Sequence, residues 1–319
     1  MQLKLKDKRI LFELEQDSRQ SLGQLAKKVR LKKETLFYRI KSLEKKEIIK
    51  KYLLEIDIYK LGYQFYPVLL RLQNTTPAIE EEIYNYLKTS QYTSWLTFCE
   101  GAWDINLTAL AKNNFELKIF LDDFLEKYSE YIAEKQIFAT SEITYFKRSF
   151  WLDKKPNKIV SSGGEFKEEI KNENLKLLRI LSENARMPLV EIGKKLRVNP
   201  KNIAYQIKKL KQQKIIQGSR VFVDFSKIGY EFYKIFFSLK NMTKENYSKL
   251  TTYFQQQENI LWATKLIGMY DLSIEIEVKD VEELRNMLKE IKQKFSNLIK
   301  KHESILIFEE SIMNYLPEK

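Results

Sequence analysis

The chain has 319 residues, of which 44% are hydrophobic and 13% aromatic, a composition that excludes a disordered protein and leaves material for several hydrophobic cores. The longest apolar runs, such as residues 305–308, are too short to cross a bilayer, and the first residues lack the apolar stretch of a cleaved signal, so we expect a cytoplasmic protein. One cysteine and one histidine are too few for an internal disulfide or a structural zinc site, and we expect no metal and no cofactor.

The net charge of +13 is concentrated in two segments. Residues 1–60 contain 17 basic and 9 acidic residues, and residues 168–229 contain 14 and 6, so each segment has a net charge of +8 while the remainder has −3. Two basic segments in an otherwise mildly acidic chain are the electrostatic footprint expected of two contacts with nucleic acid.

The sequence repeats itself at an offset of 167 residues. Between Asp7 and Phe124 about one position in four is identical in the second copy, a period far longer than that of stacked repeats, which indicates that a whole unit was duplicated. We call residues 1–167 copy one and residues 168–319 copy two. Residues 154–165, with Pro156 and a Ser-Ser-Gly-Gly run, have the composition of a flexible connection.

The first third of each copy predicts three short amphipathic helices, because apolar residues recur at spacings of three and four. In copy one these helices span residues 5–15, 21–29 and 33–46. The third helix should pack inward through Leu36, Ile40 and Leu43, and through Ile203, Ile207 and Leu210 in copy two. Asn199 is a good N-cap for the third helix of copy two, whereas Lys32 is a poor N-cap for the third helix of copy one.

The outer face of the third helix carries cations and amides around one tyrosine. Lysine and arginine neutralise phosphates, and arginine, asparagine and glutamine can read base edges in a major groove. A charged helix face is usually only solvated, but a third helix in a repeated three-helix unit favours contact with double-stranded DNA. The predicted DNA-binding residues are Lys32, Lys33, Thr35, Tyr38, Arg39, Lys41, Ser42 and Lys45 in copy one and Asn199, Lys201, Asn202, Tyr205, Gln206, Lys208 and Lys209 in copy two.

After the helices, residues 52–59 and 219–226 are rich in β-forming side chains and predict a strand pair, or wing, in each copy. The pattern then reads strand, helix, strand, strand, helix, strand, at residues 68–73, 77–89, 94–99, 104–111, 115–131 and 136–146, and copy two repeats this order. A β-α-β-β-α-β order is that of a ferredoxin-like sandwich.

The predicted fold class is therefore α+β, with two copies of a winged helix-turn-helix domain followed by a ferredoxin-like domain. The expected boundaries are a first helix-turn-helix domain at residues 1–62, a first ferredoxin-like domain at 63–150, a linker at 151–167, a second helix-turn-helix domain at 168–229 and a second ferredoxin-like domain at 230–319.

The residues from Leu31 to Glu44, with Ile48-Ile49, Asp57 and Leu61-Gly62-Tyr63, resemble the DNA-binding domain of the Lrp/AsnC, or feast/famine, transcription regulators. The family pattern has a glycine in the turn after the third helix, where this chain has Glu47 and Lys214. It has a proline where this chain has Ile58 and Phe225, and Gln206 stands where copy one has Arg39.

The second half of each copy resembles the effector-binding and oligomerisation domain of the same family, in which a glycine motif opens the third strand. The resemblance implies an effector site, for a small molecule such as an amino acid, near Gly101, Trp103 and Asp104 and near Gly268, Tyr270 and Asp271. A tight hairpin alone would also explain both glycines. The duplication implies that one chain forms the twofold unit that normally takes two, with further homo-oligomers built from it.

We therefore expect a sequence-specific transcription regulator and not an enzyme. One alternative is an architectural DNA-binding protein of low specificity, because many of the exposed groups are lysines. Another is a decarboxylase of sirohaem-type tetrapyrroles, since some Lrp-like proteins have that activity; against it, the sequence offers no convergent cluster of histidine, cysteine and acidic residues.

Overall fold

The computed structural model describes residues 3–152, 159–164 and 170–316. Its elements follow the same order in both copies, so the sequence repeat is a repeat of structure. Copy one contains α1 (Leu5–Gln16), α2 (Leu22–Val29), α3 (Lys33–Lys45), β1 (Ile49–Ile56), η1 (Ile58–Leu61), β2 (Gln64–Leu72), α4 (Pro77–Thr89), β3 (Thr93–Gly101), β4 (Ile105–Ala111), α5 (Asn114–Tyr128), η2 (Ser129–Tyr131), β5 (Ile132–Ile137), β6 (Ala139–Phe146), η3 (Phe150–Leu152) and β7 (Ile159–Gly163).

Copy two repeats this order up to its last helix, after which, among the residues that the structure describes, the single strand β12 takes the place of β5 and β6 and there is no counterpart of η2, η3 or β7. It contains α6 (Asn172–Glu183), α7 (Leu189–Leu196), α8 (Pro200–Gln212), β8 (Ile216–Val223), η4 (Ser226–Ile228), β9 (Glu231–Leu239), α9 (Lys244–Gln256), β10 (Ile260–Ile267), β11 (Leu272–Val278), α10 (Val281–Lys294) and β12 (Ile299–Met313). The α+β fold with two winged helix-turn-helix units and two ferredoxin-like units is as the sequence predicts.

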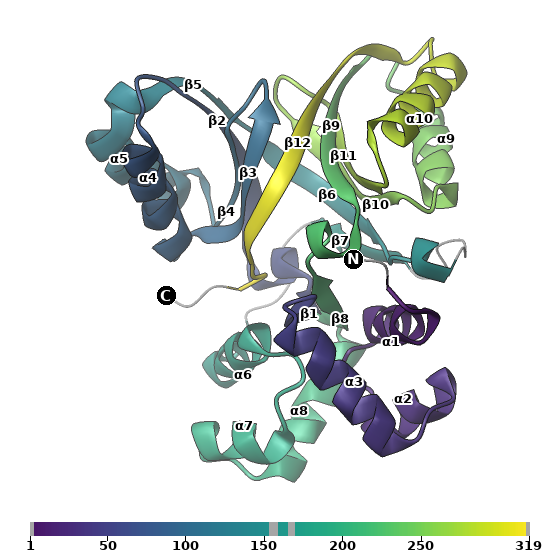
Figure 1. Ribbon diagram of the computed structural model, residues 1–319. Coiled ribbons are helices and arrows are strands. Elements are labelled where there is room, and N and C mark those ends of the chain that lie inside the picture. Colours follow the sequence, from purple (N-terminus) through teal and green to yellow (C-terminus); the bar gives the residue numbers. More distant parts are fainter. Residues whose placement is uncertain (1–2, 153–158, 165–169, 317–319) are drawn as a thin grey trace.

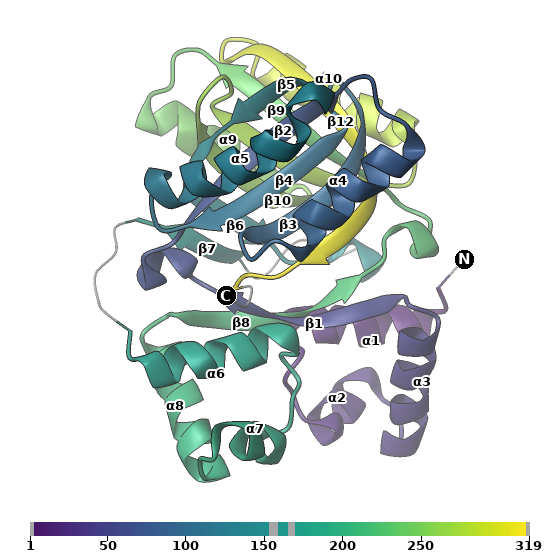
Figure 2. The ribbon, with the colours of Figure 1, turned by 90° about the vertical axis from the view of Figure 1, so that its left-hand side faces the viewer.

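The two helix-turn-helix units are joined by an antiparallel ribbon of β1 and β8. Each copy supplies one strand of this pair, whereas the sequence pattern predicts a strand pair within each copy. Figure 2 shows the ribbon lying between the helix-turn-helix units below and the sheets above. Arg19 donates a hydrogen bond to the carbonyl of Ala185, and its counterpart Arg186 donates one to the carbonyl of Ser18 over 2.8 Å. Such reciprocal contacts define a pseudo-twofold axis.

The sheets of the two copies form one ten-stranded sheet in the order β5-β2-β4-β3-β12-β9-β11-β10-β6-β7. The last strand of each copy crosses to the other, because β6 pairs with β10 and β12 pairs with β3. Helices α4 and α5 cover one outer face and α9 and α10 the other (Figure 1). The strand exchange makes the two ferredoxin-like units parts of a single body.

Part of the predicted linker is a strand. Residues 159–163 form β7, which pairs with β6 from Phe146↔Ile159 to Glu142↔Gly163. The prediction of a flexible connection is therefore wrong for this stretch, because it is hydrogen-bonded to β6 as the edge strand of the sheet. Residues 153–158 and 165–169 of the linker lie outside the described part of the chain, and the domain boundaries stay a prediction.

The residues that the structure describes form three hydrophobic cores. One lies under α4 and α5, a second lies under α9 and α10, and the third joins both helix-turn-helix units, the ribbon and the inner faces of both sheets. The third core contains residues of both copies, such as Trp95 and Trp262, so neither helix-turn-helix unit packs independently of the other copy. Among the described residues no helix is long and apolar enough to span a membrane.

Candidate nucleic-acid interface and central polar cluster

The third helix of each unit packs through the residues that the sequence selects. Leu36, Ile40 and Leu43 on α3 are buried, and so are their counterparts on α8. Leucine and isoleucine at these spacings form a single apolar stripe, which fixes the rotation of each helix about its axis. The opposite face is therefore turned to solvent, at the end of the molecule that is farthest from the sheets (Figure 1).

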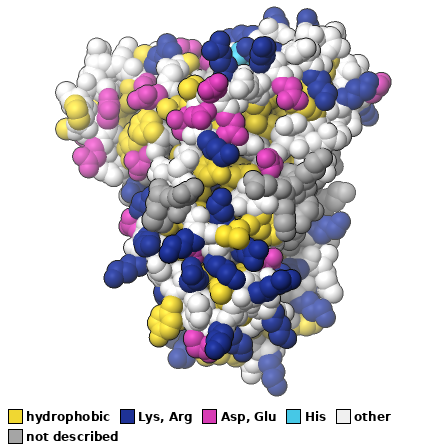
Figure 3. All heavy atoms as spheres, turned by 45° about the vertical axis from the view of Figure 1, so that its right-hand side comes forward, with side chains coloured by type: hydrophobic (Ala, Val, Ile, Leu, Met, Phe, Trp, Pro, Cys, Tyr) yellow, Lys and Arg dark blue, Asp and Glu magenta, His cyan; other side chains and the backbone are white. Residues whose placement is uncertain are grey.

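Nearly all predicted DNA-binding residues lie on that exposed face. Tyr38 and Tyr205 are 72% and 69% exposed, at equivalent positions of the two helices. Figure 3 shows lysine and arginine side chains spread over this lower half of the molecule. The exposed members of the predicted set are Lys32, Lys33, Thr35, Tyr38, Lys41, Ser42, Lys45, Asn199, Lys201, Asn202, Tyr205, Lys208 and Lys209.

Arg39 and Gln206 are the exceptions, because both are half-buried. The guanidinium of Arg39 donates to the carboxylate of Asp7 on α1 over 2.8 Å. The counterpart of Asp7 is Asn174, so an ion pair in copy one is matched by two amides in copy two. Arg39 therefore fastens α3 to α1, and its role in DNA contact stays a prediction.

The two helices begin differently, as the sequence predicts. Asn199 accepts a hydrogen bond from the backbone of Lys201 over 2.9 Å, whereas Lys32 makes no side-chain cap. In copy one a groove between α2 and α3 is lined by Ser21, Gln24, Lys27, Lys32 and Lys33, among others. Cations beside the N-terminus of a helix such as α3, whose first N–H groups have no side-chain cap, suit a phosphate. Lys27 was not among the predicted DNA-binding residues, although a lysine in the last turn of the second helix could have indicated a phosphate contact.

The turn after the third helix adopts a left-handed conformation in both copies. Glu47 and Lys214 have φ of 53° and 57°, in the region that glycine occupies without strain. These are the positions at which the family pattern has glycine. Glu47 forms an ion pair with Lys227 over 2.6 Å, which offsets part of the strain in copy one.

The residues proposed for an effector are occupied by contacts within the chain. The carboxylate of Asp104 accepts from the backbone of Leu72 over 2.7 Å, and that of Asp271 accepts from Leu239 over 2.6 Å. Each aspartate thus closes the connection between two adjacent strands of its own copy.

The other members of the motif face the opposite copy. The indole of Trp103 donates to Glu303 over 2.8 Å, Tyr270 is fully buried, and a Cβ at Gly268 would lie 2.7 Å from the ring of Phe138. Both Gly101 and Gly268 have positive φ, of 122° and 154°. The two motifs therefore serve the junction between the copies, and their effector role stays a proposal.

A cluster of buried charged side chains lies between the ribbon and the sheets. We call it the central polar cluster, and it consists of Glu15, Glu55, Lys147, Arg148, Arg220, Lys234, Glu275, Glu277 and Glu310. None of the nine is more than 6% exposed. Sequence reasoning missed it, because its members are spread over almost 300 positions and meet only through the strand exchange. One signal was available: several strand positions are charged in one copy and apolar at the equivalent position of the other, as with Glu277 and Leu110.

Ion pairs connect most members of the cluster. The ammonium of Lys147 is 2.9 Å from Glu55, that of Lys234 is 3.0 Å from Glu275, and Arg148 contacts Glu277 at 2.5 Å. The carboxylate of Glu15 accepts a hydrogen bond from the hydroxyl of Tyr145. The cluster links α1 and the ribbon to both sheets by charge as well as by packing.

Two members have no such partner within the described residues. The guanidinium of Arg220 lies over the rings of Tyr145 and Trp262, at 4.7 and 5.4 Å from the centroids, and its Nε has no hydrogen bond. Glu310 accepts from the indole of Trp95 over 2.9 Å, and burial raises its pKa to about 7. Arg220, Glu310 and the two tryptophans line a cavity of about 70 Å³.

Comparison with known proteins agrees with this architecture. Residues 3–50 and residues 174–217 each match the winged helix-turn-helix DNA-binding family. The regulator LrpC of Bacillus subtilis is 32% identical to 45% of this chain, over 95% of its own length. The chain belongs to the Lrp/AsnC family of transcription regulators. The regulatory protein AsnC of Haemophilus influenzae is 27% identical over 113 residues, which are 35% of this chain and 75% of AsnC.

One solved structure corresponds to the entire duplicated chain. The siroheme decarboxylase NirDL is similar over 98% of this chain and 94% of its own, with a TM-score of 0.63 and 13% sequence identity. At this identity the likeness concerns the fold. This likeness overturns the expectation that the chain is not an enzyme. That expectation took the architecture to be that of a regulator, whereas an enzyme has a similar architecture over 98% of this chain.

Proposed function

We propose that this Lrp/AsnC protein regulates transcription by binding double-stranded DNA through α3 and α8 together. The observation that carries the proposal is the pair of exposed, lysine-rich helix faces at one end of the molecule, fixed relative to each other by the β1-β8 ribbon. Two helices held in this way suit successive major grooves, which lie about 34 Å apart on one side of the duplex. Phosphate contacts supply the affinity and a few base contacts the selectivity.

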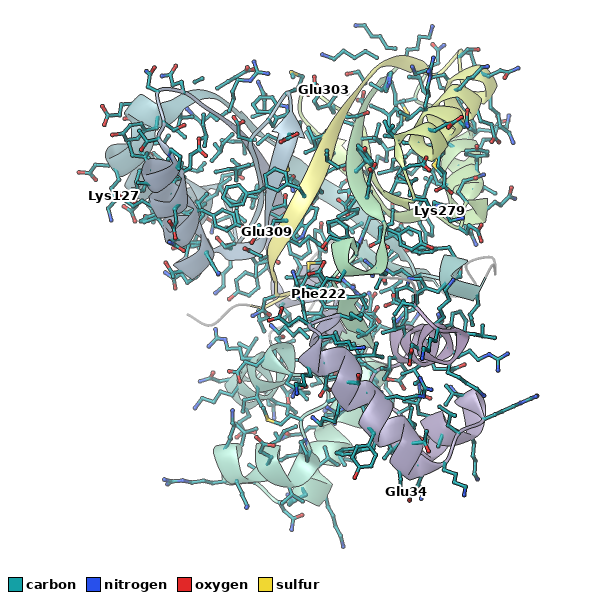
Figure 4. All side chains as sticks on the ribbon, viewed as in Figure 1. Glu34, Lys127, Phe222, Lys279, Glu303 and Glu309 are labelled. Atoms are coloured by element: carbon teal, nitrogen blue, oxygen red, sulfur yellow. The ribbon has the colours of Figure 1, made fainter. Side chains whose placement is uncertain are left out.

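The two reading helices differ, and we infer that the two half-sites of the target differ as well. α8 carries lysines and no acidic residue, whereas α3 carries Glu34 and Glu44. Figure 4 shows Glu34 on the outer end of α3. The exposed side chain of Phe37 has alanine, Ala204, as its counterpart. A carboxylate near a phosphate weakens binding and an apolar ring favours a thymine methyl, so α3 should select more and α8 should bind more tightly.

The test is selection of bound fragments from random and genomic DNA at near-physiological salt. The proposal predicts one motif with two unequal half-sites about one helical turn apart. The variant Lys208→Ala/Lys209→Ala should lose the half-site of α8, while the matched change Lys240→Ala, at an exposed position of the sheet domain, should leave the motif intact. Unselective recovery would favour the architectural alternative, and no recovery would refute DNA binding.

We also propose that a small molecule such as an amino acid modulates this binding beside the glycine motif of copy two, and that chains assemble further there. The support is apolar exposure next to Gly268, where Ile267 and Met269 are 64% and 43% exposed. Thermal-shift screening with the twenty amino acids, and mass measurement in solution with and without a hit, test both ideas. No stabilisation and a single-chain mass would refute them.

The second candidate is tetrapyrrole chemistry, favoured by the full-length likeness to a siroheme decarboxylase and by the polar cavity. A solved structure of NirDL contains an iron-uroporphyrin III analogue. The cavity of about 70 Å³ is smaller than the roughly 300–1,000 Å³ of pockets for larger ligands, so such a molecule would have to separate the sheets. Titration with iron-uroporphyrin III decides the matter. A saturable change in its absorbance that Arg220→Leu removes would support this candidate, and an unchanged spectrum would refute it.

A further inference from the structure

The central polar cluster breaks the symmetry of the duplicated chain. At an offset of 167 residues none of its nine charged members meets another charged residue. The counterparts of Glu15, Glu55, Lys147, Arg148, Arg220, Lys234, Glu275, Glu277 and Glu310 are Ser182, Phe222, Asn314, Tyr315, Leu53, Pro67, Thr108, Leu110 and Ile143. Figure 4 labels Phe222, the counterpart of Glu55, on the ribbon beneath the sheets. The charges that fill this junction therefore come from one copy or the other at each position, and never from both.

Arg220 lies on the pseudo-twofold axis itself. It pairs across the ribbon with Leu53, which is the same position of the other copy. Both side chains are buried, at 2% and 1% exposure. We call a half of the chain type one if it has the sequence of copy one and type two if it has that of copy two. If two type-two halves paired with each other, two arginines would lie directly opposite on adjacent strands, and like charges there are destabilising. Only a pairing of unlike copies leaves one arginine on the axis.

A second ion pair crosses between the copies. Arg148 comes from copy one and Glu277 from copy two, and the guanidinium contacts the carboxylate at 2.5 Å, with both residues at most 3% exposed. Two copies of type one would place leucine where each Arg148 has Glu277 and leave it only the longer contact to Glu15 at 3.9 Å, and two copies of type two would bury two glutamates against tyrosine. Removing one partner of a buried pair leaves an uncompensated charge, which is strongly destabilising.

We propose that the central polar cluster is a pairing determinant. It makes the surface that copy one presents through β1 and β6 accept copy two as its partner and reject a second copy one. The occupant of this surface is therefore the other half of the same chain or of a second identical chain. The inference concerns assembly and stands whether or not the protein binds DNA. Its consequence is that each folded unit presents one α3 and one α8, and never two of a kind.

The experiment uses the full chain carrying a protease site at residues 165–169. The protein is cleaved, unfolded in urea, refolded, and its pairs are counted by native mass spectrometry, since the two halves differ in mass. Pairing without preference would give the three combinations in the ratio 1:2:1. The proposal predicts that mixed pairs exceed each like pair by about 100-fold or more, because two type-two halves oppose two arginines and leave two glutamates without Arg148, and two type-one halves leave each Arg148 with only the longer contact to Glu15 at 3.9 Å. A 1:2:1 mixture would overturn it.

The double variant Arg220→Leu/Glu277→Leu gives copy two the residues that copy one has at these positions. It should produce pairs of two type-two halves that the parent lacks, while the exposed control Lys240→Leu should not. If the double variant refolds and still forms only mixed pairs, Arg220 and Glu277 are not the determinant and the proposal is wrong.

The uncut chain provides a test that does not depend on refolding of the halves. Leu53→Arg places a second arginine on the axis and should lower the folding equilibrium constant by about 100-fold or more, measured by urea denaturation. Adding Arg220→Leu to that variant moves the single arginine across the axis and should recover at least half of the loss on a logarithmic scale. If the second change brings no recovery, the cost is that of burying any charge, and the argument from the axis is refuted.

Discussion

Replacing Glu310 by glutamine should remove most of the pH dependence of this protein's stability between about pH 5 and 7. Glu310 is fully buried, and the groups that face it are Trp95, Arg148, Arg220 and Glu277. The central polar cluster holds five carboxylates and four cations, so one carboxylate has no cation to balance it. Glu310 is the carboxylate of the cluster without an ion pair within 4 Å among the described residues, and burial raises its pKa to about 7.

The sign of the effect follows from the direction of that pKa shift. The folded state retains the proton up to about pH 7, whereas the unfolded chain releases it near the ordinary value of about 4.5. The contribution of Glu310 to stability is therefore fully present below about pH 4.5 and is lost as the pH rises to about 7. A difference of about 2.5 pKa units corresponds to about 3 kcal/mol in the free energy of unfolding.

Urea denaturation at intervals from pH 5 to pH 8 measures the effect. The parent protein should lose stability over this range, most steeply below pH 7, and Glu310→Gln should remove most of the slope because glutamine is neutral at every pH. The exposed acid Glu309, adjacent in the chain, provides the control Glu309→Gln, which should keep the parental slope. A slope that is the same in all three proteins would refute the assignment of the uncompensated charge to Glu310.

Four further outcomes follow from the helix-turn-helix units and the ribbon. Lys214→Gly relieves a left-handed lysine and should raise the free energy of unfolding by about 0.5–1 kcal/mol, whereas Lys214→Ala should not, in thermal or urea unfolding. Arg39→Ala breaks the bond to Asp7 and should lower both stability, by about 1 kcal/mol, and DNA affinity. Lys208→Ala should leave stability unchanged and reduce the slope of log affinity against log salt by about 0.9; an equal loss of folded signal in both variants would contradict this division. Gly218→Ala should destabilise the chain by about 1–3 kcal/mol, because its Cβ would overlap the carboxylate of Glu55; the same change made in the variant Glu55→Ala should cost much less relative to Glu55→Ala alone.

The parts of the fold that depend on local periodicity could be predicted from the sequence. The helix predicted at residues 77–89 is α4, because Thr76 caps it and Pro77 occupies its first turn. The buried stripes of α3 and α8 were predictable for the same reason, since spacings of three and four fix one face of a helix. The exposed cations opposite those stripes followed without further information.

The pairing of strands could not be predicted in this way. The alternation of polar and apolar residues at 49–56 would be the same whether the strand paired within its copy or with β8. The break between β5 and β6 at Phe138 was not predictable either, because no turn-forming residue lies beside Phe138. Strand partners depend on contacts between residues far apart in the chain, and the local pattern carries no record of them. The central polar cluster was missed for the same reason, because each of its charges lies alone in an apolar stretch of sequence.

Duplication explains why such a cluster can exist in this chain. In a symmetric dimer of identical chains every buried charge appears twice, so any residue on the axis meets its own copy and a lone arginine such as Arg220 is excluded there. Once the two copies are joined they can diverge, and unlike charges such as Arg148 and Glu277 can meet across the junction. The same divergence frees α3 and α8 from reading equal half-sites. The buried asymmetry and the unequal reading helices are thus two consequences of one event, and the second is useful only if the first keeps the unlike copies together.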